Sequence, residues 1–429
     1  MITLPHHCEF LSDAWLEEAR EFLVREVAAR RERLAGRAFS LSERFTDAPP
    51  HLKLAGDVAA WSARYDGEKI ELRRGFDERA DVVVEGDYQA ALTAAQFVGV
   101  FAPGAMDALM REIAAIFGAG AVRARGQFAD PQAAELVAML HDHMARRTVE
   151  NPDLAHRAAR QGVAQKIRDM EEQGYAVLER AISPEFADEL RAATLRALLT
   201  HGSDRSQQLG GTGTQLQWML YHGREFERLA QHPLLLTLID ASLGRGAVIG
   251  SLSAIRKGPG KTAIPIHTDY ALVPEPHPEF ALTGVGVWAL EDWRVESGPT
   301  WVIPGSHRLR RSPRPGEAHP PGVPIEMPKG SVVFFTHGLW HWQGDRSEPG
   351  DRVTLHWHFN RGILRSLEPK RVDPQLLHRN SPRLGEMLGE DDPFDTIHHV
   401  GRDYARLEYM ARLLRFTEQQ KQKILRREA

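Results

Sequence analysis

The sequence has almost no cysteine: Cys8 is the single thiol in 429 residues. This scarcity excludes an intrachain disulfide framework, and it excludes zinc or iron–sulfur sites that need several cysteine ligands. No stretch approaches the ~20 apolar residues that a helix needs to cross a bilayer. The chain also opens without the basic stretch and apolar run of a signal peptide, so we expect a cytoplasmic protein that is not integral to a membrane.

Neither sign of charge is in large excess. The chain has 54 Lys and Arg residues against 58 Asp and Glu residues, which gives a formal net charge of −4. This balance offers no electrostatic basis for binding nucleic acid or an anionic membrane surface. The length exceeds that of one ordinary core and predicts two domains. Nothing in the sequence indicates an oligomeric state.

The first 150 residues mix helical and strand patterns. Two alternating runs, Trp61–Tyr65 and Lys69–Leu72, flank the pair Asp66-Gly67. This pair favours the tight turn of a hairpin, so the two runs predict adjacent antiparallel strands. Another strand is predicted from Ala80 to Gly86. Helical periodicity follows in three segments: residues 88–101, 104–117 and 131–147.

Three stretches of this region, "WSARYDGEKIELRRG", "ADVVVEGDYQAALTA" and "VAMLHDHMARRT", resemble the sterol-carrier-protein-2-like family. The resemblance covers residues 1–150. It implies a small sheet whose helices enclose an apolar tunnel for lipids or acyl chains. Apolar residues at helical spacing are equally expected as ordinary core, so both interpretations stay open. The candidate tunnel residues are Phe97, Val98, Phe101, Met106, Leu109 and Phe117.

A breaker-rich linker at residues 151–163 precedes a second region with a different pattern. After two helical segments, the chain becomes rich in strands from Ala247 onward. Many short strands with Gly and Pro turns, and no alternation with helices, predict a barrel or a double-sheet jelly roll. Residues 364–429 are polar and helical in pattern, and residues 404–426 predict one long helix.

His267 and Asp269 form the pair on which the functional argument rests. Residues two apart in a strand project from the same face, so both side chains can bind one ion. An H-x-D triplet is expected about once by chance in a chain so rich in His and Asp, so the pair alone is weak. Two imidazoles and one carboxylate bind ferrous iron on one face and leave the opposite face open. His337 and His341 are both candidates for the second imidazole.

The last predicted strand, residues 352–360, alternates sharply between polar and apolar side chains. Arg352, Thr354, His356 and His358 share one face, and the apolar side chains share the other. Because the apolar face packs against a partner layer, the polar face is expected to line the interior of the barrel. An arginine is costly there unless it is paired, either with a dicarboxylate ligand or with a structural Asp or Glu.

The motifs "HTD", "SGPTWVIPGSH" and "KGSVVFFTHGLWH", followed by Arg352, resemble the phytanoyl-CoA dioxygenase family over residues 164–362. In that family the arginine comes eleven residues after the second histidine, so the resemblance implies that His341 completes the iron site. It implies that Arg352 binds the far carboxylate of 2-oxoglutarate, with Trp288 and Gln343 as further cosubstrate contacts. The implied cofactor is Fe(II), and the cosubstrates are 2-oxoglutarate and O2.

The resemblance thus implies a dioxygenase that hydroxylates an unactivated C–H of a small, lipid-like or carrier-bound substrate and releases succinate and CO2. Tyr270, Trp218 and Tyr221 are the candidate substrate contacts. The alternatives are a non-catalytic lipid-binding or transfer protein with an idle barrel, and a cupin-type metal isomerase that does not use 2-oxoglutarate.

The expected fold class is α+β. A double-stranded β-helix (jelly-roll) oxygenase core with flanking helices is expected over residues 164–363. It follows an N-terminal α/β sterol-carrier-like domain over residues 1–150, and a helical C-terminal extension covers residues 364–429.

Overall fold

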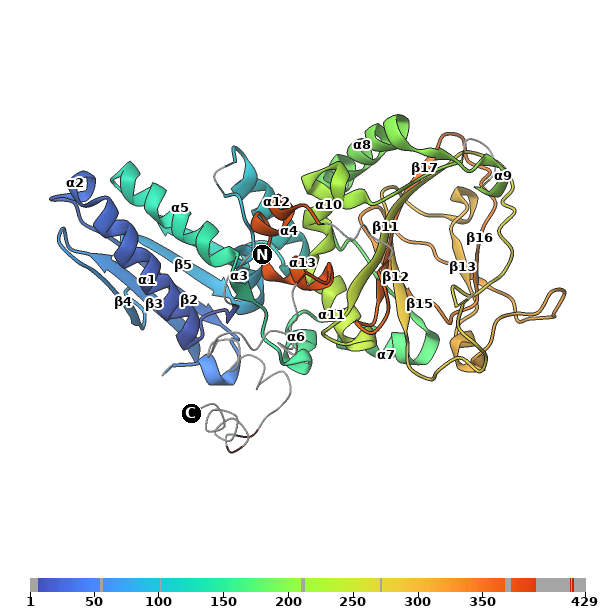
Figure 1. Cartoon of the computed structure of the whole chain (residues 1–429), viewed down its shortest axis with the longest axis horizontal. Helices are drawn as coiled ribbons and strands as arrows, with labels where there is room; N and C mark the ends of the chain where they lie inside the picture. The colour runs from blue at the N-terminus through green and yellow to red at the C-terminus, as the bar shows by residue number, and fades with distance from the viewer. Residues whose placement is uncertain are drawn as a thin grey trace. The chain divides into compact units, whose positions relative to one another are not determined.

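The computed structural model describes residues 7–54, 57–100, 102–209, 213–270, 272–366, 372–390, 417 and 419. The chain divides into two compact units, which are described separately (Figure 1). The first contains the chain up to Gln161 together with Val372–Gly385, and the second contains Gly162–Arg371 with Glu386–Glu390. The long helix predicted at 404–426 lies outside the described residues except for residues 417 and 419. Within the described part of the chain, no helix has the length and apolarity to cross a membrane.

The first unit is built on a five-stranded sheet in the order β4-β3-β2-β5-β6. Its neighbours pair antiparallel except for the parallel pair β2–β5. The predicted hairpin is confirmed as β3–β4, and the Asp66 carboxylate closes its turn by accepting hydrogen bonds from the amides of Glu68 and Lys69, each at 2.9 Å. The strands are β2 (Phe39–Thr46), β3 (Val58–Tyr65), β4 (Ile70–Arg74), β5 (Val82–Asp87) and β6 (Val122–Gly126).

Helices cover one face of this sheet, and α1 and α5 lie across it in Figure 1. Helix α1 begins after Ser12, whose side chain accepts a hydrogen bond from the amide of Trp15. Its apolar stripe, including Trp15 and Phe22, is buried in the core of the unit. The helical elements are α1 (Asp13–Ala29), α2 (Arg31–Leu34), η1 (Pro50–Leu52), α3 (Tyr88–Ala95), α4 (Ala105–Phe117), α5 (Pro131–Ala145), α6 (Leu154–Arg160) and α12 (Pro374–His378). Two short strands, β1 (Cys8–Glu9) and β7 (Thr148–Val149), form a separate pair.

Two expectations for this region differ from what the structure shows. The segment predicted as a linker contains α6, which is counted with the first unit. A cavity of about 380 Å³ lies between the sheet and the helices. Of the six candidate tunnel residues, Met106 lines this cavity and Phe101 lies outside the described residues. The other four do not line it: Phe97, Val98, Leu109 and Phe117. The sterol-carrier-like identity of the unit stays a prediction.

The second unit is built on two antiparallel sheets. The larger has the order β8-β15-β12-β17-β11-β10-β9, and the smaller has the order β14-β13-β16. The strands are β8 (Tyr175–Leu178), β9 (Ser203–Asp204), β10 (Thr214–Gln217), β11 (Val248–Lys257), β12 (Thr283–Ala289), β13 (Thr300–Val302), β14 (Val323–Pro324), β15 (Val332–Thr336), β16 (His341–Gln343) and β17 (Arg352–Asn360).

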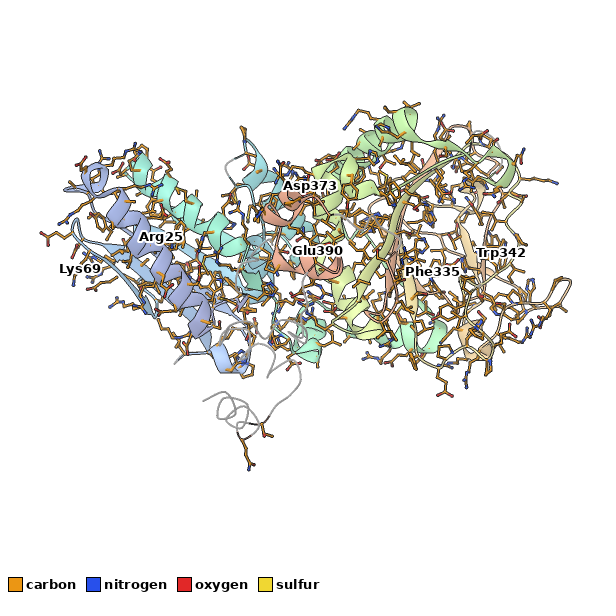
Figure 2. The ribbon with its side chains drawn as sticks, in the orientation of Figure 1. Arg25, Lys69, Phe335, Trp342, Asp373 and Glu390 are labelled. Atoms are coloured by element: carbon orange, nitrogen blue, oxygen red, sulfur yellow. The ribbon has the colours of Figure 1, made fainter. Side chains whose placement is uncertain are left out.

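The two sheets face each other across an apolar core. Val285 of β12, Phe335 of β15 and Val302 of β13 belong to one buried cluster, so side chains of both sheets meet there. Phe335 and Trp342 mark the larger and the smaller sheet in Figure 2. The predicted α+β class is confirmed, and the double-sheet arrangement agrees with the predicted jelly-roll core.

Helices cover the other face of the larger sheet. Helix α11 contacts β12, β15 and β17, and helix α8 contacts β10, β11 and β17. Side chains of the larger sheet that point away from these helices therefore line the space between the two sheets. The helical elements are α7 (Ala164–Gln173), α8 (Pro184–His201), α9 (Ser206–Leu209), η2 (Met219–His222), α10 (Arg224–Ala230), α11 (Pro233–Leu243), η3 (Val295–Ser297) and η4 (Ser306–Leu309). Helix α13 (Pro382–Met387) is counted with the first unit up to Gly385 and with the second unit from Glu386.

Candidate metal centre

The backbone brings His267 and Asp269 against the segment that leads into β16. The amide of His267 donates to the carbonyl of His341 at 2.9 Å, and the amide of His341 donates back at 3.0 Å. The amide of Asp269 donates to the carbonyl of His337 at 2.9 Å. These bonds fix the register between two segments about seventy residues apart, so both candidate histidines lie beside the H-x-D pair.

The side chains of His267, Asp269 and His341 converge. One potential ligand atom from each lies within 4.8 Å of the other two. His267 Nε2 is 3.6 Å from Asp269 Oδ1, and His341 Nε2 is 3.7 Å from Asp269 Oδ2. Three donors that face one point at these separations can hold one cation.

Both imidazoles turn Nε2 toward that point. Nδ1 of His267 is 2.8 Å from the carbonyl of Pro265, and Nδ1 of His341 is 3.0 Å from the carbonyl of Leu339. Because a carbonyl only accepts hydrogen bonds, Nδ1 of each ring carries a proton, and in the neutral ring Nε2 keeps its lone pair. A carbonyl behind the ring is the support that metal-binding histidines ordinarily have.

The Asp269 carboxyl is held in its ionised form. Burial by itself would raise its pKa, but the imidazoles of His341, His337 and His267 hold the pKa well below its ordinary value. Burial also lowers the pKa of His341 and so favours the neutral ring. Burial acts in the same direction on His267, but the hydrogen bond and charge of Asp269 outweigh it and raise the pKa of His267 above its ordinary value. The group therefore offers carboxylate oxygens and the Nε2 atoms of two imidazoles.

His337, the alternative ligand, also lies near Asp269, but its ring is engaged elsewhere. Its Nε2 is 3.5 Å from Asp269 Oδ2 and 3.1 Å from Nδ1 of His358, and its Nδ1 is 2.6 Å from the hydroxyl of Thr283. Asp269, His337 and His358 thus form a second convergent group that shares the carboxylate. Burial lowers the pKa of His337 to about 3, so its ring is neutral. A ligand role for His337 would require its bond to His358 to break.

Arg352 lies at the start of β17 and is 2% exposed. Its guanidinium donates to the carbonyl of Gly298 and lies 5.1 Å from the centre of the Trp293 ring, while its Nε has no hydrogen-bond partner among the described residues. Burial lowers the pKa of Arg352 to about 10, and the nearby Glu291 opposes this shift. The chain does not supply this buried cation with an ion pair within 4.0 Å in its described part, so it can bind an anion.

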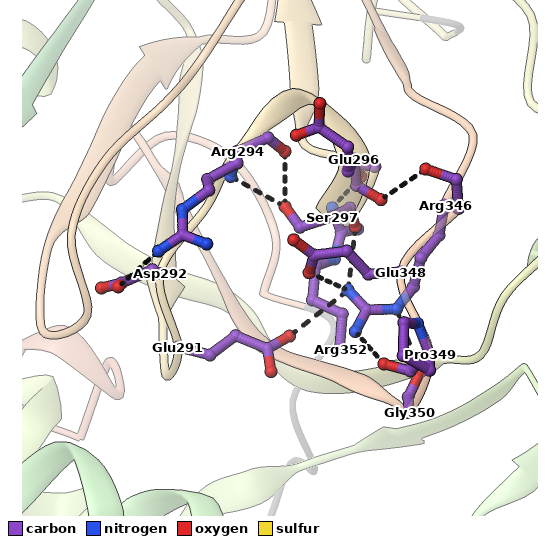
Figure 3. A network of polar contacts seen from close by, with 12 residues as sticks. Glu291, Asp292, Arg294, Glu296, Ser297, Arg346, Glu348, Pro349, Gly350 and Arg352 are labelled. Carbon is purple, nitrogen blue, oxygen red and sulfur yellow. Dashed lines mark hydrogen bonds and ion pairs between the residues drawn. The ribbon is translucent and has the colours of Figure 1, made fainter.

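Arg346, a neighbouring buried cation, is fully engaged by the protein. It donates to the carbonyls of Ser297, Pro349 and Gly350 at 3.0–3.2 Å, and it lies 3.8 Å from a carboxylate oxygen of Glu291 (Figure 3). These bonds connect the segment at Ser297 to the turn at Pro349 and Gly350. Arg346 is therefore a structural cation, in contrast to Arg352 in the same view.

Lys257 is a second interior cation that sequence reasoning missed. It pairs with Arg352 in the β11–β17 register, so both side chains project from the same face, and Lys257 is 0% exposed. Its Nζ donates to the carbonyl of Gly344 at 2.7 Å. Burial and the charge of Arg352 lower the pKa of Lys257 to about 8. The strand register was needed to find it, because nothing in the local sequence pairs residue 257 with residue 352.

The structure corrects the expectation for Trp288. This residue pairs with Leu355 and therefore lies on the helix-covered face of the larger sheet, where its ring centre is 5.1 Å from that of His232. Arg352 projects from the opposite face, so Trp288 does not line the same space. Trp293 is the aromatic residue that contacts the arginine.

Gln343 lies on the interior side of the smaller sheet. It shares a face with His341, because Trp342 between them projects to the other side and stacks on Trp301 at 5.7 Å. Its predicted contact with the cosubstrate stays a prediction.

The three candidate substrate contacts differ in exposure. Tyr270 is buried, and its hydroxyl accepts a hydrogen bond from the amide of Leu282 at 2.8 Å. Trp218 and Tyr221, which follow β10, are 48% and 38% exposed. Tyr270 therefore supports the segment after Asp269, while Trp218 and Tyr221 offer exposed aromatic surface. Contact with substrate stays a prediction for all three.

The sequence is similar to that of several known proteins. It is 23% identical over 204 residues to an uncharacterized protein of Mycobacterium tuberculosis, a match that covers 45% of this chain and 73% of that protein. It is 29% identical over 152 residues to the dioxygenase andF of Emericella variicolor, covering 33% of this chain and 47% of that protein.

Solved structures that are similar include the non-heme alpha-ketoglutarate-dependent epimerase SnoN from nogalamycin biosynthesis, with 22% identity, a TM-score of 0.39, and coverage of 49% of this chain and 91% of that one. HygX from Streptomyces hygroscopicus, solved with nickel and 2-oxoglutarate, has 15% identity, a TM-score of 0.41, and coverage of 49% and 92%. Residues 170–352 match the family model of phytanoyl-CoA dioxygenase (PhyH). This segment contains His267, Asp269 and His341 and ends at Arg352, so the similarity to the phytanoyl-CoA dioxygenase family covers all four of these residues.

Proposed function

We propose that the chain is an Fe(II)- and 2-oxoglutarate-dependent dioxygenase that hydroxylates an unactivated C–H of a small, lipid-like or carrier-bound substrate and releases succinate and CO2. The observation that carries this proposal is the convergence of His267, Asp269 and His341, within 4.8 Å, inside the segment that matches the PhyH family. The families of iron oxygenases use this combination of two imidazoles and one carboxylate.

The residues present fit a ferrous ion. Asp269 is ionised, and Nε2 of His267 and Nε2 of His341 face the same point, where a ferrous ion would take the place of a proton that Asp269 holds on His267. When bound, iron together with 2-oxoglutarate and oxygen supplies the oxidising chemistry. The protein holds the ligand geometry.

Arg352 is the residue that would hold the cosubstrate. Its planar guanidinium can bind a carboxylate through two parallel hydrogen bonds, and its burial strengthens that ion pair because little water screens it. Trp293 packs against the guanidinium and restricts its orientation. The apolar interior face of β12, which includes Val285 and Val287, excludes water from the adjacent space.

The test is succinate formation from 2-oxoglutarate with Fe(II) and ascorbate. Arg352→Ala should reduce turnover at least about a hundredfold, because the cosubstrate loses its only proposed bidentate partner. Arg256→Ala is the matched control: Arg256 lies on β11 one residue from Lys257 but pairs with Asp351 at 2.6 Å on the other face, so its loss should leave turnover unchanged. Asp269→Ala should also lose bound iron.

Wild-type turnover in Arg352→Ala, or full iron content in Asp269→Ala, would contradict the proposal. The same assay separates the two alternatives. A barrel used only for binding forms no succinate and needs no iron, and a metal isomerase binds iron but forms no succinate.

A further inference from the structure

The cavity of the first unit lies between the sheet and helices α3, α4 and α5. Its volume of about 380 Å³ falls in the range of sites that bind small molecules. Most of its lining is apolar and includes Leu41 and Phe45 of β2, Met110 of α4, and Leu140 of α5. All of these residues belong to one unit, so the cavity is a property of that unit by itself.

One carboxylate, Glu43, lies in the middle of this apolar wall. It pairs with Trp61 of β3 and with Val84 of β5, and Val84 pairs with Ala124 of β6; all four residues line the cavity. Because side chains alternate along a strand, position 43 shares its face with Leu41 and Phe45. A residue at this position is expected to be apolar when packing is its only role.

Glu43 has one polar partner in the described part of the chain, the indole N–H of Trp61, which donates to Oε2 at 2.8 Å. No Lys or Arg among the described residues forms an ion pair with it. Burial accordingly raises the pKa of Glu43 to about 7. Glu85, on the opposite face of the same sheet, is different, because Arg44 donates to it at 2.6 Å. A half-buried acid in an apolar wall, with one hydrogen-bonded oxygen, costs stability, so its presence indicates a ligand group that completes its hydrogen bonding.

The described residues that line the cavity include no Lys or Arg that could receive an anionic ligand. Its second polar side chain, His141, donates from Nε2 to the carbonyl of Phe97 at 3.0 Å, and burial lowers its pKa, so the ring is neutral. The carboxylate of a fatty acid would enter beside Glu43 without a compensating charge. A hydroxyl or an amine, in contrast, donates a hydrogen bond to the free oxygen of Glu43.

We propose that this cavity binds a largely apolar molecule through one hydrogen-bond-donating group, a hydroxyl or an amine, that Glu43 accepts, and that it discriminates against the corresponding carboxylic acid. The proposal does not depend on the oxygenase activity of the second unit. It assigns the first unit a ligand class that follows from the charge and position of a single side chain.

The experiment is displacement of the neutral dye Nile red from the full chain at pH 7.5 by four ligands with the same alkyl chain: 1-dodecanol, dodecylamine, dodecyl methyl ether and dodecanoate. The alcohol or the amine should displace the dye at a concentration about tenfold lower than the ether or the acid requires, because only the first two donate a hydrogen bond to Glu43. The stronger of the two identifies the donor group. Equal displacement by the ether, or stronger displacement by the acid, would overturn the proposal.

Variants locate the effect. Glu43→Leu should bring the alcohol and the ether within about twofold of each other, and Glu43→Gln, which keeps an acceptor oxygen but no charge, should weaken the amine more than the alcohol. Ala91→Phe fills the cavity and should reduce dye binding itself at least about tenfold. Glu85→Gln, the same chemical change on the opposite face, should change nothing. An alcohol preference that survives Glu43→Leu, or dye binding unaffected by Ala91→Phe, would place the site elsewhere.

Discussion

Replacing Lys257 with methionine should make the chain more stable and weaken its binding of 2-oxoglutarate. Lys257 is fully buried, its ammonium has one carbonyl acceptor at 2.7 Å, and it lies opposite Arg352 in the strand register. Burial and the charge of Arg352 lower its pKa from the ordinary 10.5 to about 8. Methionine retains an unbranched stem of similar length and removes the charge.

The pKa shift sets the magnitude. One pKa unit corresponds to about 1.4 kcal/mol, so the lowering from 10.5 to about 8 amounts to roughly 3 kcal/mol. A basic group whose pKa is lower in the folded chain than in the unfolded chain destabilises the folded state. The full cost applies at pH values below the pKa of the folded state. This cost disappears as the pH rises from 8 to 10.5, where the unfolded chain also releases the proton. The free energy of unfolding of Lys257→Met should therefore exceed that of the wild type by up to about 3 kcal/mol at pH 7, and the difference should shrink above pH 8.

Urea unfolding followed by tryptophan fluorescence at pH 7, 8, 9 and 10 measures this difference. Lys329→Met is the control, because Lys329 is partly exposed and lies 2.9 Å from Asp188; its effect should not follow the same pH profile. A gain for Lys257→Met that is constant with pH, or a loss at pH 7, would refute the reasoning.

The cosubstrate part of the prediction has its own readout. Thermal unfolding of the iron-loaded protein in a 2-oxoglutarate titration should show about tenfold weaker binding in Lys257→Met than in the wild type, because one of two interior cations is lost. Equal affinity would show that Arg352 acts without Lys257.

Three further predictions concern the site, the first unit and the division of the chain. His341→Ala should reduce iron content after Fe(II) loading to below about a tenth of the wild-type value. His337→Asn should keep the iron, because neighbouring side chains engage both ring nitrogens of His337. Loss of iron in His337→Asn with retention in His341→Ala would show that His337 is the ligand. Glu43→Gln should raise the free energy of unfolding more at pH 8 than at pH 5, because burial raises the pKa of Glu43 to about 7 and the cost of its ionised form grows from pH 4.5 to 7; equal gains in urea unfolding at both pH values would argue against a buried acid. A fragment of residues 155–429 should fold, as judged by circular dichroism, and bind iron and 2-oxoglutarate; a folded fragment without metal would show that the first unit is needed for the site.

The side-chain directions of several site residues were predictable from local sequence patterns. The spacing of His267 and Asp269 places both on one side of an extended segment, and the alternation of residues 352–360 separates the polar interior face of β17 from its apolar face. The tight-turn pair Asp66-Gly67 predicted the β3–β4 hairpin. These features depend on residues within a few positions of each other, so the sequence contains the information directly.

The position of Trp288 shows where such reasoning fails. The strand around it is apolar on both faces, because Val285 and Val287 point between the sheets while Trp288 points to the helices. Alternation identifies which residues share a face, but it does not identify the face that turns inward when both are apolar. The pairing of β12 with β17 decides that, and these strands are far apart in the chain.

The sequence by itself determined the kinds of donor available to a metal and the alternation of the strands that carry several of them, because both are properties of short segments. Only the tertiary structure decided that the ring of His337 is bound to His358 while His341 keeps a free nitrogen, and that Lys257 lies beside Arg352. It also decided that Glu43 faces a cavity. The physical reason is that strand register and burial arise from contacts between distant segments, and these contacts set the charge, protonation and partners of each side chain.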